Sequence, residues 1–186
     1  MPRRVNTVLF VCTGNQCRSP MASAILARLL ENRGAAVRVQ SAGFAGEGAP
    51  CPREVHAVMA PLGYDLAAHR SQIVTEEMIR GSDLVIGMTR QHLIDLSLLT
   101  PHSSSRLFTF GEVDRLAAAV GVREPGETFD AWLFRIGRCR TRQGTLSLPL
   151  SEDVSDPIGR PLRAYLETRD QLLSLAGSLA NRMQPV

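Results

Sequence analysis

The side chains best suited to chemistry are Cys12 and Arg18, which lie six positions apart in the segment Val11–Pro20. A cysteine thiolate is a strong nucleophile, and a guanidinium is a planar donor that binds phosphate with two hydrogen bonds. The spacing alone means little in a chain with 21 basic residues, all of them arginine. Its context is more informative, because Cys12 follows an apolar run, and Gly14 and Asn15 tolerate left-handed backbone angles. The segment therefore predicts a loop that binds a tetrahedral anion.

A helix is expected directly after Arg18, and this junction adds positive charge to the site. The loop amides, the amino end of the helix and the Arg18 guanidinium would all face one dianion. The same field would stabilise the thiolate form of Cys12. Ser19 has two open interpretations, a helix cap or a hydroxyl that hydrogen-bonds the Cys12 sulfur. The predicted phosphate-binding loop comprises Thr13, Gly14, Asn15, Gln16, Cys17, Arg18 and Ser19.

Apolar runs that alternate with helical patterns must position this loop. Strands are predicted at Val5–Val11, Val37–Ser41, Leu84–Met88 and Leu107–Phe110. Helices are predicted at about Pro20–Arg33, Glu54–Leu62, Arg90–Leu99, Glu112–Val120 and Leu162–Arg182. This alternation predicts an α/β fold with a parallel sheet covered on both faces and a ligand site beyond the carboxyl ends of the strands. The stretch at about 121–150, rich in Gly and Pro, is predicted to be an irregular insertion.

Composition favours one domain spanning residues 1–186, with 44% hydrophobic and 21% charged residues. The net charge is only +3 and aromatic residues make up 5%, so no nucleic-acid partner is expected. The early apolar run Val8–Val11 is too short for a signal-peptide core, and no later run could span a membrane. We therefore expect a cytoplasmic protein without a membrane partner.

The cysteines are expected to be reduced in that compartment, with two structural disulfides as the alternative. They are Cys12, Cys17, Cys51 and Cys139. No zinc-type spacing of Cys or His is present, so neither a metal nor another cofactor is expected.

Further short motifs follow the loop Cys12–Ser19 along the chain. They are Ser41-Ala42-Gly43, Gly63 with His69-Arg70-Ser71, Asp83-Leu84-Val85-Ile86 with Met88, and Asp156-Pro157. In this order they resemble the low-molecular-weight protein tyrosine phosphatase family, in its bacterial form, over nearly the whole chain. The resemblance implies a three-layer sandwich with a central four-stranded parallel sheet flanked by helices. It also implies that the phosphate-binding loop joins the first strand to the first helix.

The resemblance assigns the general acid to Asp156. The residues alone make Asp156-Pro157 a turn and leave Glu152 and Asp153 as equal rivals for the acid. The implied reaction is an in-line attack by Cys12 on phosphorus, with Arg18 and the loop amides holding the phosphate oxygens. A cysteinyl-phosphate intermediate is then hydrolysed by water. Support of the loop by hydrogen bonds is implied for Asn15, Ser19, Ser41 and His69.

Cys17 lies five residues after Cys12 in a loop that must curl around one phosphate. It is a candidate redox partner, because a neighbouring thiol can capture an oxidised cysteine as a disulfide. The alternative is a small buried residue that packs under the loop.

The expected substrate is a phosphorylated protein, most simply one carrying phosphotyrosine, and inorganic phosphate or other oxyanions should also bind. Ile158-Gly159 departs from the family, because many members have an aromatic residue after the Asp-Pro pair. The loop also resembles that of protein arginine phosphatases, although Gln16 replaces their threonine, so phosphoarginine is the alternative. An arsenate reductase-type thiol enzyme is disfavoured because the range 81–109 has no resolving cysteine. A silent phosphate-binding module is disfavoured because the nucleophile and acid are both present.

Overall fold

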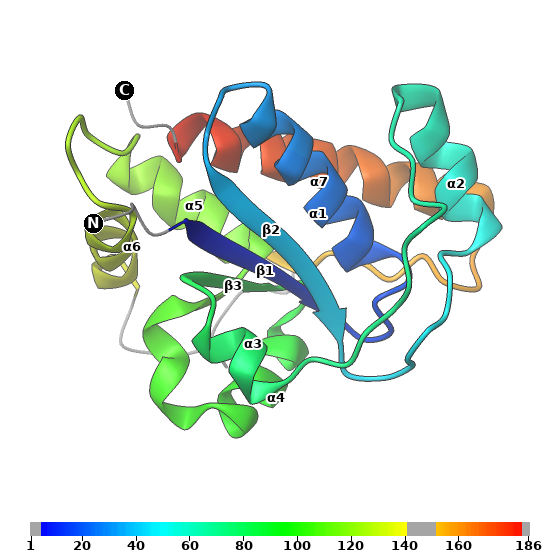
Figure 1. Cartoon of the computed structure of the whole chain (residues 1–186), viewed down its shortest axis with the longest axis horizontal. Helices are drawn as coiled ribbons and strands as arrows, with labels where there is room; N and C mark the ends of the chain where they lie inside the picture. Colours follow the sequence, from blue (N-terminus) through cyan, green and yellow to red (C-terminus); the bar gives the residue numbers. More distant parts are fainter. Residues whose placement is uncertain (1–4, 141–151, 184–186) are drawn as a thin grey trace.

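The centre of the fold is a parallel sheet of four strands in the order β2-β1-β3-β4 (Figure 1). The structure, a computed structural model, describes residues 5–140 and 152–183. The strands are β1 (Asn6–Cys12), β2 (Val37–Gly43), β3 (Leu84–Gly87) and β4 (Leu107–Thr109). The helices are α1 (Arg18–Glu31), α2 (Arg53–Met59), α3 (Glu76–Arg80), α4 (Arg90–Leu99), α5 (Phe110–Val120), α6 (Phe129–Arg138) and α7 (Leu162–Arg182). The described residues also form the 3-10 helices η1 (Ala60–Leu62) and η2 (Pro101–Arg106). The predicted fold class is confirmed.

Strand β1 is buried on both faces and holds the layers together. Side chains alternate along a strand, so Val8 and Phe10 join one core while Leu9 and Val11 join the other. The larger core packs against α1, α2, α5, α6 and α7, and the smaller one against α3 and α4. Figure 1 shows α1, α2, α5 and α7 on one face of the sheet and α3 and α4 on the other. The end of β1 is therefore fixed from both sides.

Several element boundaries differ from the predictions. Helix α1 begins at Arg18, two residues earlier than expected, so Arg18 lies in its first turn. Strand β4 stops before Phe110, because the Thr109 side chain accepts a hydrogen bond from the Glu112 backbone N–H (3.1 Å) and caps α5. Helix α3 was not predicted, since five residues give too short a pattern to recognise.

The expectation of an irregular stretch is wrong for the residues that form α6. Thr128 caps this helix, and Phe129, Trp132, Leu133 and Ile136 form its buried face. The i, i+3, i+4, i+7 spacing of these apolar residues was the signal that could have predicted it. Trp132 is fully buried and donates to the Gly121 carbonyl oxygen (3.2 Å), so α6 packs locally beside α5. Residues 141–150 of the predicted insertion lie outside the described residues.

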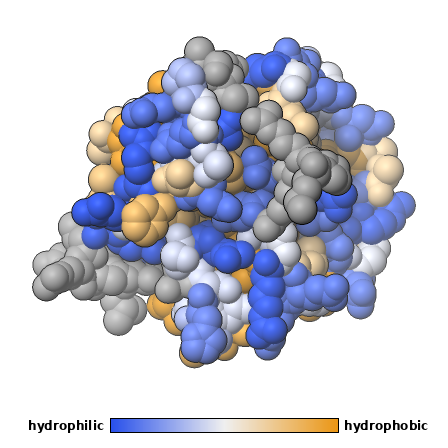
Figure 2. Space-filling view, turned by 60° about the vertical axis from the view of Figure 1, so that its left-hand side comes forward, coloured by the Kyte–Doolittle hydropathy of each residue, from blue (hydrophilic) through white to orange (hydrophobic). Residues whose placement is uncertain are grey.

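The surface around α6 is mostly hydrophilic. Figure 2 is turned toward the side of the molecule that carries α6, and it shows only scattered apolar side chains. Among residues 5–140 and 152–183, no helix combines the length and apolar character needed to cross a membrane.

Candidate active site

The loop between β1 and α1 lies at the carboxyl end of β1, where the chain order in the sheet changes direction. Cys12 is the last residue of β1, and Gly43 is its partner in the register with β2. A Cβ atom on Gly43 would lie 2.7 Å from both the Asn15 nitrogen and the Thr13 carbonyl oxygen. Only glycine fits there, because the loop packs directly on the end of β2.

Asn15 holds the loop in its curled form. Its φ of 50° is the only positive φ of a non-glycine residue among those described, whereas Gly14 does not use the left-handed region. The buried Asn15 amide donates to the hydroxyl oxygens of Ser19 and Ser41, each at 2.9 Å. Its Oδ1 accepts from the Gln72 backbone N–H at 3.0 Å, and its carbonyl oxygen accepts from His69 Nε2 at 2.7 Å. The residues proposed for loop support thus meet at Asn15, together with Gln72, which sequence reasoning missed.

Ser19 lies beside the sulfur of Cys12. The two side chains are buried, and their Sγ and Oγ atoms are 3.0 Å apart. Cys17, not Ser19, occupies the N-cap position of α1 and makes no side-chain cap hydrogen bond, and Ser19 lies within the first turn, so the interpretation of Ser19 as a helix cap is wrong. The Ser19 hydroxyl has one hydrogen and two acceptors in reach, the sulfur and the Ala42 carbonyl oxygen at 3.3 Å. A thiolate at Cys12 would draw this hydrogen to the sulfur.

The Arg18 side chain is buried, and its guanidinium is held at three points. NH1 donates to the Val154 carbonyl oxygen (3.3 Å), and NH2 donates to Thr13 Oγ1 (3.2 Å) and Asp156 Oδ2 (2.5 Å). Its Nε is buried and has no hydrogen-bond partner among the described residues. A buried N–H without a partner is costly, so this atom needs an acceptor in the working state. An anion oxygen in the loop would supply one.

The three acidic candidates differ in what they bind. Glu152 is buried and pairs with Arg115 at 2.5 Å, and Asp153 Oδ1 accepts from the Arg90 backbone N–H at 2.8 Å. Asp156 is the one that reaches Arg18, and its side chain is 41% exposed. Only Asp156 therefore combines contact with the loop and access to a ligand.

A contact that sequence reasoning missed lies on the far side of the loop. His92, in the first turn of α4, has its Nε2 3.0 Å from Thr13 Oγ1. Its Nδ1 accepts from the Thr89 backbone N–H at 3.2 Å. Burial and the charge of Arg18 lower the pKa of His92 to about 4. The ring is therefore neutral near pH 7, with its hydrogen on Nε2.

All four cysteines carry free thiols. Cys17 and Cys51 are buried, and burial raises the pKa of Cys17 strongly and that of Cys51 to about 12. Cys139 is exposed at the end of α6. The side chains of Cys17 and Cys51 are thus protonated near neutral pH.

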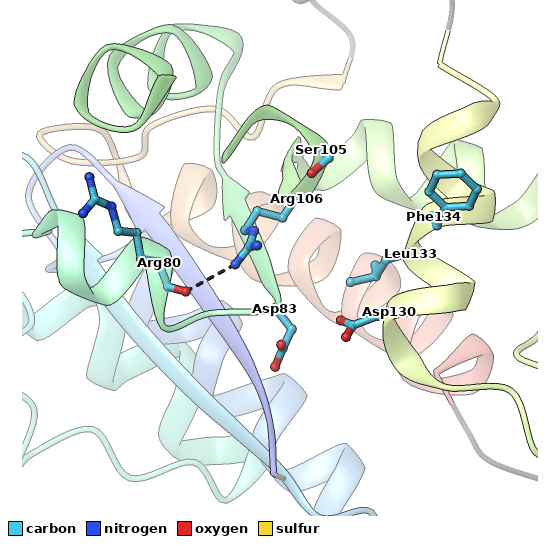
Figure 3. A pocket seen from close by; sticks show the side chains of 7 residues that line it. All are labelled: Arg80, Asp83, Ser105, Arg106, Asp130, Leu133 and Phe134. Atoms are coloured by element: carbon cyan, nitrogen blue, oxygen red, sulfur yellow. Dashed lines mark hydrogen bonds between the residues drawn. The ribbon is translucent and has the colours of Figure 1, made fainter. Parts of the chain in front are cut away.

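A cavity of about 380 Å³ lies at the end of the sheet opposite to the loop, near the amino ends of the strands (Figure 3). It is lined by Arg80, Asp83, Ser105, Arg106, Asp130, Leu133 and Phe134. In Figure 3 Arg106 turns toward the Arg80 carbonyl oxygen, to which it donates at 3.2 Å. The cavity lies near the amino ends of β3 and β4 and is remote from Cys12. Chemistry, not cavity size, therefore identifies the candidate site.

Comparisons with known proteins agree with this geometry. The family model described as low molecular weight phosphotyrosine protein phosphatase matches residues 7–137. The protein-arginine-phosphatase of Bacillus subtilis (strain 168) is 32% identical over 180 residues, which cover 95% of this chain and 96% of the relative. The low molecular weight protein-tyrosine-phosphatase Etp of Escherichia coli (strain K12) is 34% identical over 110 residues, covering 59% of this chain and 72% of Etp.

Solved structures show the same similarity. The crystal structure of the low molecular weight protein tyrosine phosphatase from T. tengcongensis superposes with a TM-score of 0.73 and is 30% identical. The superposition covers 96% of this chain and 99% of that chain. Asp156 and α7 lie beyond the residues that the family model matches, but within the length that this structure covers almost completely.

Proposed function

Because the chain belongs to the low molecular weight phosphotyrosine protein phosphatase family of cysteine-dependent phosphatases, we propose that it hydrolyses phosphotyrosine in proteins through Cys12. Asp156 is the proposed general acid, and Arg18 with the loop amides is the proposed phosphate-binding group. A bacterial source is part of the proposal because the relatives compared above are bacterial, and so is the cytoplasmic location expected from the sequence.

One observation carries the proposal: the buried Cys12 thiol and the buried Arg18 Nε, which has no hydrogen-bond partner among the described residues, lie at the two ends of the same curled loop. The loop amides and the amino end of α1 add partial positive charge around the thiol. This arrangement suits a phosphate whose three equatorial oxygens accept from the amides and Arg18. The chain's own donors thereby neutralise the charge that develops in phosphoryl transfer.

The proposed reaction has two steps. The Cys12 thiolate forms a bond to phosphorus while the bond from phosphorus to the leaving oxygen breaks, and Asp156 gives that oxygen a proton. In the second step water attacks the cysteinyl-phosphate, Asp156 takes a proton from this water, and Cys12 leaves as the thiolate. The Ser19 hydroxyl lies 3.0 Å from the sulfur. It stabilises the Cys12 thiolate as the nucleophile of the first step and as the leaving group of the second.

Phosphoarginine is a second candidate substrate, and the mouth of the site favours testing it. Ile158, which follows the Asp156-Pro157 pair, is 45% exposed and offers an aliphatic surface instead of an aromatic ring. Gln16 is half-buried and carries an amide that can hydrogen-bond a guanidinium. The Bacillus subtilis relative, named a protein-arginine-phosphatase, aligns along nearly the whole chain.

The test is turnover of matched phosphotyrosine and phosphoarginine peptides by one enzyme preparation, with Cys12→Ser as the control. We expect phosphate release from phosphotyrosine peptides by the wild type and none by the variant. Cys12→Ser should still bind phosphate or vanadate, because the anion site consists of backbone amides and Arg18. Activity of the variant at a tenth of the wild-type rate would contradict the role of Cys12. A higher kcat/KM on phosphoarginine peptides would make phosphoarginine, and not phosphotyrosine, the preferred substrate.

A further inference from the structure

The guanidinium of Arg18 must keep one orientation to bind phosphate with two hydrogen bonds, and the structure shows what can fix it. Of its three anchors, the Asp156 carboxylate is the one that must leave to act on the leaving group. The Thr13 hydroxyl and the Val154 carbonyl oxygen remain. The plane of the guanidinium during catalysis therefore depends on how firmly these two groups are held.

Thr13 is held by His92. The Thr89 backbone N–H occupies Nδ1 of the ring, so Nε2 carries the hydrogen and donates to Thr13 Oγ1 at 3.0 Å. The same oxygen accepts from Arg18 NH2 at 3.2 Å. The two donors, His92 and Arg18, together occupy both lone pairs of the Thr13 hydroxyl oxygen. Thr13 is otherwise exposed at the mouth of the loop, and a free threonine hydroxyl would rotate.

The His92 ring is fixed in turn by its surroundings. It is only 5% exposed, stacks on Phe44 with ring centroids 5.8 Å apart, and forms a reciprocal capping pair with Thr89 at the start of α4. The neighbouring Met88 carbonyl oxygen accepts from the Val154 backbone N–H at 2.7 Å. The junction of β3 and α4 thus holds both permanent anchors of Arg18.

We propose that His92 is a positioning residue that acts as a neutral donor and, through the Thr13 hydroxyl, fixes the Arg18 guanidinium for phosphate binding. The inference rests on the proposed phosphatase function. His92 itself touches neither the phosphate nor the leaving group in this scheme. Its loss should weaken oxyanion binding and turnover together and leave proton donation by Asp156 unchanged.

A double-mutant cycle tests this chain of contacts. We expect Thr13→Val and His92→Phe each to lower kcat/KM by about tenfold or more, with a similar loss on phosphotyrosine and on an activated aryl phosphate. The double variant should lose no more than the worse single variant, because both changes break one chain of contacts. His92→Gln, which keeps an amide donor, should recover part of the loss. His102→Phe, a change at an exposed histidine of η2, is the matched control and should behave as wild type.

Binding of vanadate, measured by calorimetry on the same proteins, separates this inference from the proposed function. We expect weaker vanadate binding by Thr13→Val and His92→Phe even if the wild type hydrolyses neither phosphopeptide. Losses that multiply in the double variant would overturn the inference. It would also be overturned if His92→Phe lowered only thermal stability and kept wild-type kcat/KM and vanadate affinity.

Discussion

Replacing Asp156 by asparagine should separate two effects of one carboxylate. In the structure Asp156 Oδ2 accepts from Arg18 at 2.5 Å, so the carboxylate competes with an incoming phosphate for the same guanidinium. The same side chain is the proposed proton donor to the leaving group. Asparagine keeps the size and one acceptor oxygen but has neither the charge nor the acidic proton. The variant should therefore bind phosphate better and turn over substrate more slowly.

The two magnitudes can be worked out separately. Loss of the proton donor should lower kcat/KM on phosphotyrosine roughly 100-fold, within the usual range for general acid catalysis. An activated aryl phosphate, whose leaving group is stable as an anion, should lose clearly less. The ion pair is half open to solvent, because Asp156 is 41% exposed, so its removal is worth at most about 1 kcal/mol. This free energy corresponds to phosphate binding that is tighter by up to about fivefold.

The assay measures kcat/KM on both substrates and the inhibition constant of phosphate, for wild type, Asp156→Asn and Asp153→Asn. Asp153 is a matched control because its carboxylate binds the Arg90 backbone N–H and does not contact Arg18 among the described interactions. Equal losses on the two substrates, or a larger loss from Asp153→Asn, would refute Asp156 as the acid. Weaker phosphate inhibition of Asp156→Asn would refute the competition for Arg18.

Three further predictions follow from the site. Arg18→Lys should lose roughly 100-fold or more in kcat/KM, because an ammonium cannot replace a planar two-pronged donor, and near-normal kinetics would contradict this role. The lowered pKa of His92, about 4, means that the unfolded chain takes up its proton at higher pH than the folded one. Stability from this residue should be complete above pH 6.5 and fall by up to about 3 kcal/mol toward pH 4, and urea unfolding of His92→Gln should show a smaller fall. If Cys17 captures oxidised Cys12, peroxide should inactivate the wild type reversibly and form a Cys12–Cys17 crosslink seen by mass spectrometry, whereas Cys17→Ser should not recover with dithiothreitol; equal recovery without the crosslink would make Cys17 a packing residue.

The fold could be predicted because its elements are long and regularly patterned. The bounds predicted for Arg90–Leu99 and Leu162–Arg182 match α4 and α7, whose apolar residues recur at helical spacing. The two missed helices were missed for different reasons: α3 has only five residues, whereas α6 has a clear apolar spacing but is surrounded by glycines and prolines that suggested a loop. An element as short as α3 depends on its cap and on tertiary packing, which periodicity does not report.

The loop itself could be predicted because the residues that form it are contiguous in the sequence. Seven successive residues after Cys12 supply the curl, the donors and the start of a helix, and each has a local physical reason. The hydroxyl of Ser19 was ambiguous between two roles, since only the position of the helix start distinguishes a cap from a partner of the sulfur. Gln72 and His92 could not be assigned, because they reach the loop from other elements.

The proposed general acid shows why such remote contacts matter. Residues 152–156 contain three carboxylates, and nothing local ranks them. The segment packs on α5 and on the residue after β3: a Cβ on Gly111 would lie 2.7 Å from the Glu152 Cα, and the Val154 N–H donates to the Met88 carbonyl oxygen. The Glu152 carboxylate is engaged by Arg115, whereas the Val154 carbonyl oxygen and the Asp156 carboxylate accept hydrogen bonds from the Arg18 guanidinium. The packing of α5 against the segment therefore helps to select the proposed acid, so Gly111→Ala, whose methyl group would meet the Glu152 backbone at 2.7 Å, should move Asp156 away from the leaving group.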